Sequence, residues 1–279
     1  MVKHLPPVVK QLLSSRSTQS LPSPPIPKLH AVLTSTFNDA QQRKVENGWL
    51  VLSTCTLLTA NVPSSIGHLY KFTTRKDYND AGSRRSLPEA VMKAAIMRES
   101  ALKSTIFVGV PRTILALSGL MEVAEEDVKG ILRTESHRTS TPENIKAVLS
   151  RGQALWNSIY APHEVKLYDK LGSYHPDFIS FIIQSYGSVL APLPGENEQG
   201  NLSRTLGSVV GVACLRTEGG VGPQLTSHVF GLLKARTVQG LNEEDKWLSG
   251  DEGTEWVIRT VDTLLDVLQP KKYPATAKL

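Results

Sequence analysis

The sequence of 279 residues predicts an all-α protein, on three observations. Apolar residues recur at the spacing of one helix face along most of the chain, as at Ile145, Val148 and Leu149. No run shows the strict alternation of apolar and polar residues that marks a half-buried strand. In addition, one apolar helical segment occurs twice.

The repeated segment indicates two related helical units. The stretch Glu46–His68 returns as Thr205–His228 with one inserted residue, and Cys55 then falls on Cys214. In each copy we expect an apolar helix, a short break and a second helix that opens near a histidine. The recurring order favours a duplication, with units at about 30–122 and 141–268. A chance similarity between two apolar helices is the alternative.

The net charge of +5 is concentrated near the N-terminus. The region before Asp39 holds four basic residues and no acid, so the rest of the chain carries a net charge of only +1. This balance gives no support for a face that binds nucleic acid. No apolar run reaches the roughly 18 residues that a membrane-spanning helix needs. We therefore expect neither a nucleic-acid partner nor a membrane span.

The two ends of the chain are expected to be flexible. Residues 1–28 form a basic arm rich in Pro and Ser, with one short helix at Val8–Leu13. Its acid-free composition is typical of a mitochondrial transit peptide, whereas its prolines suit a plain flexible arm. Residues 269–279 form a tail after the last helix.

The first unit should contain helices separated by polar or proline-containing breaks. Ser86, followed by Pro88 and Glu89, is typical of a helix N-terminus, because a serine caps free amides and proline fits the first turn. Gly109 and Pro111 mark a sharp turn after that helix. Residues 29–47 begin the unit, and the expected helices span about 47–60, 62–72, 86–105 and 112–122.

A charged linker at 124–140, with one helical stretch, precedes the second unit. Thr141 and Pro142 again mark a helix start, and Pro270 ends the last helix. Loops are expected at 191–202, 219–223 and 237–253. The expected helices span about 141–159, 174–186, 203–217, 224–236 and 254–268.

Three stretches carry a family resemblance. Residues 87–117 hold an acidic helix and an aromatic-x-Gly-x-Pro turn, and residues 203–230 hold a helix pair with an early histidine in its second member. Residues 152–187 look like a pair of lead-in helices. Over about residues 30–268 the pattern resembles the carboxymuconolactone decarboxylase family and its AhpD-like relatives, and it is similar to the two-unit fungal members. The resemblance implies an AhpD-like helical fold.

The resemblance also implies a pocket with a glutamate early in one helix and a histidine early in the next. Glu46 and His68 match these positions; in the second unit His228 matches, but Thr205 replaces the glutamate. A carboxylate facing an imidazole in an apolar pocket can tune its pKa, so that the pair moves a proton beside a carbonyl or onto the carbanion left by loss of CO2. The alternative is a surface glutamate with a capping or interfacial histidine.

Glu99 is a further candidate. It is expected either to line the same cleft or to pair with Lys103, four residues later, on a solvated helix face. The implied chemistry requires no cofactor and no metal. The other histidines lack the i, i+3 or i, i+4 partners of a metal site.

The thiols do not match the redox branch of the family. That branch places a Cys-x-x-Cys before the histidine, where this chain has Asn61 and Ser64 in the first unit. This excludes thiol-peroxidase chemistry of that kind. Cys55 and Cys214 are expected to be buried core residues of a protein in a reducing setting.

The last three residues, Ala277, Lys278 and Leu279, are a conservative variant of the Ser-Lys-Leu peroxisomal signal. They follow the final helix, where an import receptor could reach them. The sequence therefore predicts delivery to the peroxisome, and the basic arm suggests delivery to the mitochondrion as well.

Two classes of function stay open. The first is a cofactor-free decarboxylase or lactone-processing enzyme that acts on a small organic acid or lactone, which the pair Glu46 and His68 favours. The second is a non-catalytic binding or assembly protein in peroxisomal metabolism, which Thr205 and the missing thiol pair favour. Because helical pairs leave apolar faces uncovered, we also expect a homo-oligomer, either a trimer or a hexamer.

Overall fold

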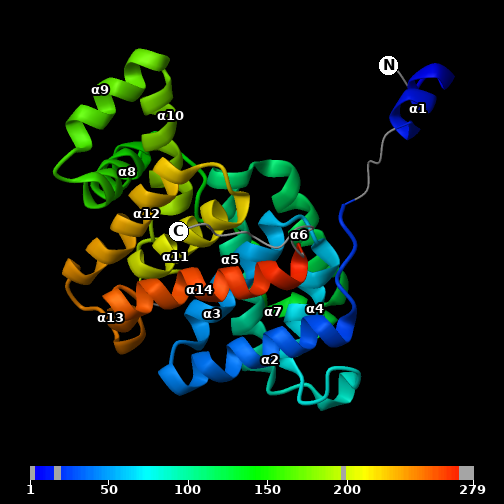
Figure 1. Cartoon of the computed structure of the whole chain (residues 1–279). Coiled ribbons are helices and arrows are strands. Elements are labelled where there is room, and N and C mark those ends of the chain that lie inside the picture. The colour runs from blue at the N-terminus through cyan, green and yellow to red at the C-terminus, as the bar shows by residue number, and fades with distance from the viewer. Residues whose placement is uncertain (1–3, 16–19, 196–198, 270–279) are drawn as a thin grey trace, which may run out of the picture.

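The computed structural model describes residues 4–15, 20–195 and 199–269, and over these residues the fold is all-α. Fourteen α-helices, with short 3-10 and π turns, make up the regular structure of these ranges (Figure 1). The described ranges contain no strand. The prediction of an all-α protein is thus confirmed. The targeting residues Ala277, Lys278 and Leu279 lie outside the described ranges.

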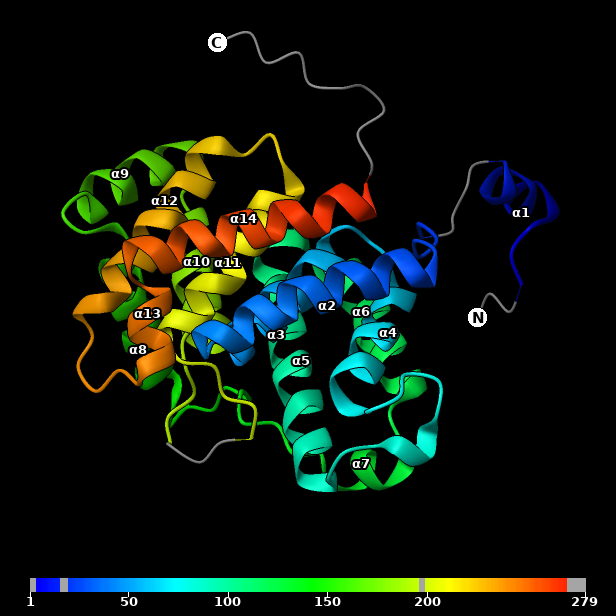
Figure 2. The same ribbon diagram turned by 60° about the horizontal axis from the view of Figure 1, so that its bottom comes forward.

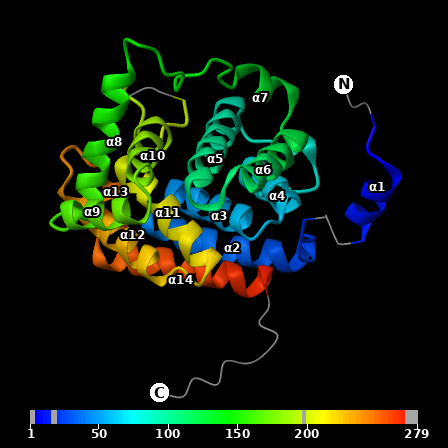
Figure 3. The ribbon, with the colours of Figure 1, turned by 90° about the horizontal axis from the view of Figure 1, so that it is seen from above.

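Two buried helices form the centre of the molecule. Helices α3 (Glu46–Thr59) and α11 (Arg204–Glu218) pack on each other, and most of their residues are buried. Helices α5 (Leu87–Val108) and α14 (Asp251–Leu268) each contact both central helices. Figure 3 shows α5 and α14 on opposite sides of the central pair.

The two copies of the repeated segment meet at this centre. Cys55 of α3 and Cys214 of α11, which occupy equivalent positions in the repeat, lie 3.4 and 3.3 Å from the same hydroxyl, that of Ser104. Both are free, buried thiols. The copies have different neighbours, because α4 packs on α6 whereas α12 packs on α8. The duplication itself stays a prediction.

The first unit follows the predicted breaks closely. The hydroxyl of Ser86 accepts a hydrogen bond from the Glu89 amide and caps α5, and Gly109, at φ +83°, ends it. Figure 2 shows α2 lying beside α14 across one face. The other helices of this part are α2 (Ile26–Arg43), α4 (Pro63–Thr74), α6 (Val110–Val123) and α7 (Glu126–Ile131).

The second part adds a subdomain made of three helices before α11. Its small core is separate from the main one. Gly152 and Gly187 allow the backbones to touch: a Cβ on Gly187 would lie 1.9 Å from the Val148 carbonyl oxygen. The helices are α8 (Ile145–Tyr160), α9 (Glu164–Tyr174) and α10 (Phe178–Ser185), the last continued by a π turn at Tyr186–Leu190.

The prediction of a loop at 237–253 is wrong in part. It contains the short helix α13 (Glu243–Leu248), and α14 starts at Asp251 rather than Thr254. The side chain of Asn242 accepts a hydrogen bond from the Asp245 amide and so caps α13. Acidic residues fill its first turn, which favours a helix start. Helix α12 (Gly222–Lys234) precedes this region.

The N-terminal arm contains the predicted short helix. Helix α1 (Pro7–Ser14) stands apart from the other helices in Figure 1, and no residue of it is buried. The arm ends slightly earlier than expected, since α2 begins at Ile26. Across the described part of the chain, no helix has both the length and the apolarity to cross a bilayer, as the sequence predicted.

Candidate functional site

A cleft of about 560 Å³ is bounded by α2, the start of α3, the end of α4, the following loop and the first half of α5. Its apolar wall is aromatic: the rings of Phe37, Trp49 and Phe72 pack together with centroids 4.8 to 5.9 Å apart. Trp49 is fixed because its Nε1 donates a hydrogen bond to Thr36 at 2.9 Å. This volume falls within the range of about 300–1,000 Å³ that small-molecule sites occupy.

Basic side chains outnumber acidic ones around this cleft. Arg75 is already paired, with a nitrogen 3.2 Å from the Glu125 carboxylate. The ammonium groups of Lys76 and Lys93 form no hydrogen bond or ion pair with any residue that the structure describes. They are therefore available to an anion. The charged residues that line the cleft are Glu46, Arg75, Lys76, Arg85, Glu89 and Lys93.

Glu46 lies in the wall of this cleft, as the first residue of α3. Its side chain is half-buried, and within the described ranges its carboxylate has no hydrogen bond or ion pair. Glu46 is thus an unengaged carboxylate that can act on a bound molecule.

His68 lies behind the cleft rather than in its wall. Its Nδ1 is joined by a short hydrogen bond to the hydroxyl of Tyr78, and Tyr78 does line the cleft. Partial burial, and then the positive charge of Lys71, lower the pKa of His68, so its imidazole is neutral at pH 7. Burial raises the pKa of Tyr78. The structure therefore connects His68 with the cleft of Glu46 through Tyr78.

His228 lies in a different place, on α12. It lines a cavity of about 10 Å³, and Phe107 packs edge-on against its ring at 5.1 Å. Gly211 leaves room for the ring, since a Cβ there would lie 2.8 Å from Nδ1. No described residue exchanges a hydrogen bond with its nitrogens. Burial, and then the charge of Arg204, lower the pKa of His228 to about 4.

Arg204 is the main residue of this second cluster. Its guanidinium donates hydrogen bonds to the hydroxyls of Ser158 and Ser208 and to the Gly231 carbonyl oxygen. No carboxylate among the described residues pairs with it. Burial lowers its pKa to about 10, so the group stays charged at pH 7. Sequence reasoning missed Arg204 as a site residue, because nothing in the sequence distinguishes a partly buried arginine from an exposed one at a helix start.

The second cluster cannot repeat the chemistry of the first. Thr205, at the position equivalent to Glu46, is fully buried, and its hydroxyl has no hydrogen-bond partner among the described residues. The structure brings Glu46 and His68 to one side of the central helices and leaves His228 in the other cluster. The four candidate residues therefore do not form one site.

Glu99 lies apart from the cleft of Glu46. It is buried in α5, where it forms a short hydrogen bond with Arg138 and lies 3.4 Å from the Lys103 ammonium. The pairing with Lys103 is the expected one, but it is buried rather than solvated. The Lys103 ammonium also donates to three carbonyl oxygens, those of Val189, Leu190 and Ala191. Glu99 thus contributes to a structural network.

The described residues contain no group of three or more His, Cys, Asp or Glu side chains that could hold a metal ion. No protein-family model, no curated protein and no solved structure matches the chain.

Proposed function

We propose that the cleft of Glu46 binds a small organic acid with a flat, apolar body. Support comes from one arrangement: an aromatic wall lines the same cleft as Lys76 and Lys93, whose ammonium groups have no described partner. The lysines would attract the carboxylate of the ligand, and the rings would cover its body. A lactone that carries a carboxylate has this combination of groups.

We further propose that a proton is moved in this cleft without a cofactor. Loss of CO2 breaks a carbon–carbon bond and leaves its electron pair on the remaining carbon, which must then take up a proton. Glu46 would take up a proton from water and deliver it to that carbon, and His68 would position the Tyr78 hydroxyl, to which it is hydrogen-bonded, in the wall of the cleft. This is the lyase chemistry that the resemblance to carboxymuconolactone decarboxylases implies.

A non-catalytic acid-binding protein is the second candidate. It is favoured by the position of His68, which does not line the cleft, and by the replacement of the second glutamate by Thr205. In this case Glu46 would only select ligands, and the fold would serve binding or assembly.

The experiment measures binding and turnover separately. Carboxylated lactones are titrated into the protein by calorimetry, and release of CO2 is followed in parallel. Lys93→Ala should weaken binding about fivefold, the effect of one exposed ion pair. Glu46→Gln should reduce turnover about 100-fold or more, and His68→Ala should also reduce it. Glu143→Gln, at an exposed position that lines no described cavity, is the control.

Each outcome has one meaning. Binding with turnover that depends on Glu46 supports the enzyme. Binding that depends on Lys93 without turnover supports the second candidate. Absence of any binding, or measurable turnover that the Glu46 and Glu143 variants affect equally, contradicts the proposal for this cleft.

We also propose a homo-oligomer, a trimer or hexamer, that is imported into peroxisomes. Exposed large apolar side chains support the assembly, since they gather on α6 and on α10, where Val110, Ile114, Phe178 and Phe181 are 57%, 59%, 41% and 62% exposed. Light scattering should give three or six copies of the chain per particle.

Import is tested by imaging a tagged chain with a free Leu279, which should appear in peroxisomes and move to the cytosol when that residue is removed. The same images show whether the basic N-terminal arm also directs the chain to mitochondria.

A further inference from the structure

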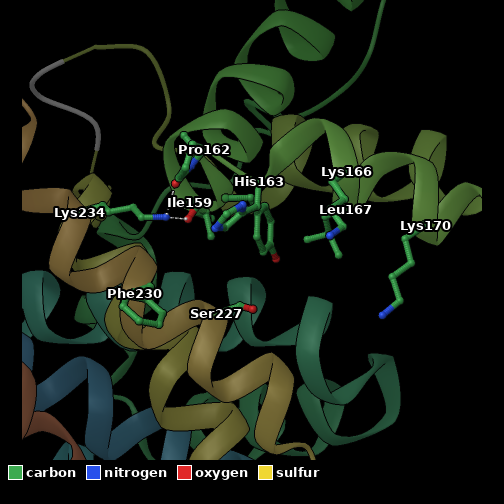
Figure 4. Close-up of a pocket in the computed structure, with 11 residues that line it drawn as sticks. Ile159, Pro162, His163, Lys166, Leu167, Lys170, Ser227, Phe230 and Lys234 are labelled. Carbon is green, nitrogen blue, oxygen red and sulfur yellow. Dashed lines mark hydrogen bonds between the residues drawn. The ribbon is translucent and has the colours of Figure 1, made fainter.

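A second cleft, of about 440 Å³, lies between α9, the end of α8 and α12 (Figure 4). Its walls are mostly apolar. Leu167 of α9 and Phe230 of α12 face it from two sides, and Pro162 lies at one end. Phe230 is 55% exposed, although it is a large aromatic side chain. An apolar ligand that covers this ring would remove apolar surface from water, which favours binding.

This cleft carries positive charge and no negative charge of its own. Lys166 and Lys170 are one helical turn apart on α9 and both line the cleft, and Figure 4 shows the Lys170 side chain extending away from the helix. Their ammonium groups have no partner within the part of the chain that the structure describes. Lys234 adds a third charge, held by the carbonyl oxygens of Ile159 and Ala161 at 2.7 and 2.6 Å. No described acidic side chain lines the cleft.

The surroundings reinforce this charge. Ile159 separates the cleft from the cluster of Arg204, since it lines both cavities. Arg204 is a partly buried guanidinium without a described carboxylate, and His228 beside it is 5% exposed with unengaged ring nitrogens. Partial burial, and then Arg204, lower the pKa of Lys234, while the nearby carboxylate of Glu164 opposes them. The cleft and the adjoining cavity of Arg204 thus hold four cationic side chains, Lys166, Lys170, Lys234 and Arg204, and no described acidic side chain lines either cavity.

We propose that this second cleft binds a free carboxylate with an unbranched apolar chain, such as a medium-chain fatty acid. The carboxylate lies between Lys166 and Lys170, and the chain covers Leu167 and Phe230. Both halves of the ligand are required, because the walls select an apolar body and the lysines select an anion. The proposal is independent of the cleft of Glu46, which has its own lysines and a different aromatic wall.

Calorimetry with decanoate, below its micellar concentration, tests the proposal on the full chain. We expect saturable binding at one site, and binding of 1-decanol and of acetate at least tenfold weaker, since each lacks one half of the ligand. The double variant Lys166→Glu, Lys170→Glu should weaken decanoate binding about tenfold or more, because two attractive charges become repulsive. Both positions are exposed, so the fold should not change.

Two matched controls make the result specific. Lys28→Glu with Lys146→Glu changes the net charge equally at exposed positions outside the described cavities and should alter binding less than twofold. Phe230→Ala should weaken binding about fivefold, and Phe181→Ala, at a position of similar exposure, should not. The proposal is overturned if decanoate does not saturate, if decanol binds equally well, or if the two charge-reversed variants behave alike. A loss of lactone binding in the first cleft would leave these results unaffected.

Discussion

Replacing His228 by a residue that does not titrate should remove a defined part of the acid sensitivity of the protein. The pKa of this histidine is about 4 in the folded chain and about 6.5 in an unfolded one. The unfolded state therefore gains a proton first as the pH falls, and stability is lost between about pH 6.5 and pH 4. Above pH 6.5 both states are neutral at this residue and the effect is absent.

The magnitude follows from the two pKa values. One pKa unit corresponds to about 1.4 kcal/mol, so the full loss approaches about 3 kcal/mol at pH 4, and about 2 kcal/mol is already lost at pH 4.5. Carboxylates titrate in the same range. For this reason the quantity to measure is the difference between the wild type and His228→Phe, whose ring has a similar size and meets Phe107 in the same place.

Urea unfolding followed by circular dichroism at pH 7 and pH 4.5 measures this difference. His228→Phe should lose about 2 kcal/mol less than the wild type between these conditions, whatever its stability at pH 7. His228→Gln, which also lacks a titrating ring, should show the same reduced dependence. Equal losses in the wild type and both variants would show that the ring is protonated as easily in the folded chain as in water.

Three further predictions concern the frame around the two clefts. Lys103→Met removes the donor to three carbonyl oxygens and should cost about 3–5 kcal/mol in urea unfolding, whereas Lys93→Met, at a partly exposed position, should cost under about 1 kcal/mol. Gly187→Ala places a methyl group 1.9 Å from a carbonyl oxygen and should lower the melting temperature; Gly172→Ala, in open space on α9, should raise it slightly, and the reverse order would contradict the packing. Ser203→Ala removes the N-cap of α11 and a 2.8 Å hydrogen bond to a carboxylate, with an expected cost of about 1–2 kcal/mol; no change would show that the cap is dispensable.

Local sequence features predicted most of the helices, because the physical causes lie within a few residues. Ser86 caps α5 and Gly109 ends it, as their positions in the sequence suggested. Helix α13 was not predicted, because it has only six residues, too few to show a periodic apolar face. Its capping residue, Asn242, and the acidic residues of its first turn were the available indications.

The candidate sites were harder to predict, since they depend on contacts between distant segments. Glu46 was singled out from its match to the glutamate position that the family resemblance implies, but Tyr78, which connects His68 with the cleft, belongs to a polar loop without a motif. Arg204 and Lys103 resemble any surface cation in the sequence. Their roles arise only where the folded chain removes water from around them.

The crossing of α5 and α14 over both central helices sets a limit on how the chain can be divided. A cut in the stretch that joins the two units would give an N-terminal piece whose α5 faces an absent α11, and a C-terminal piece whose α14 faces an absent α3. Each piece would expose a broad apolar surface to water, and neither piece would be expected to fold as an independent domain. Mixing the pieces should restore the molecule, because each supplies the surface that the other lacks.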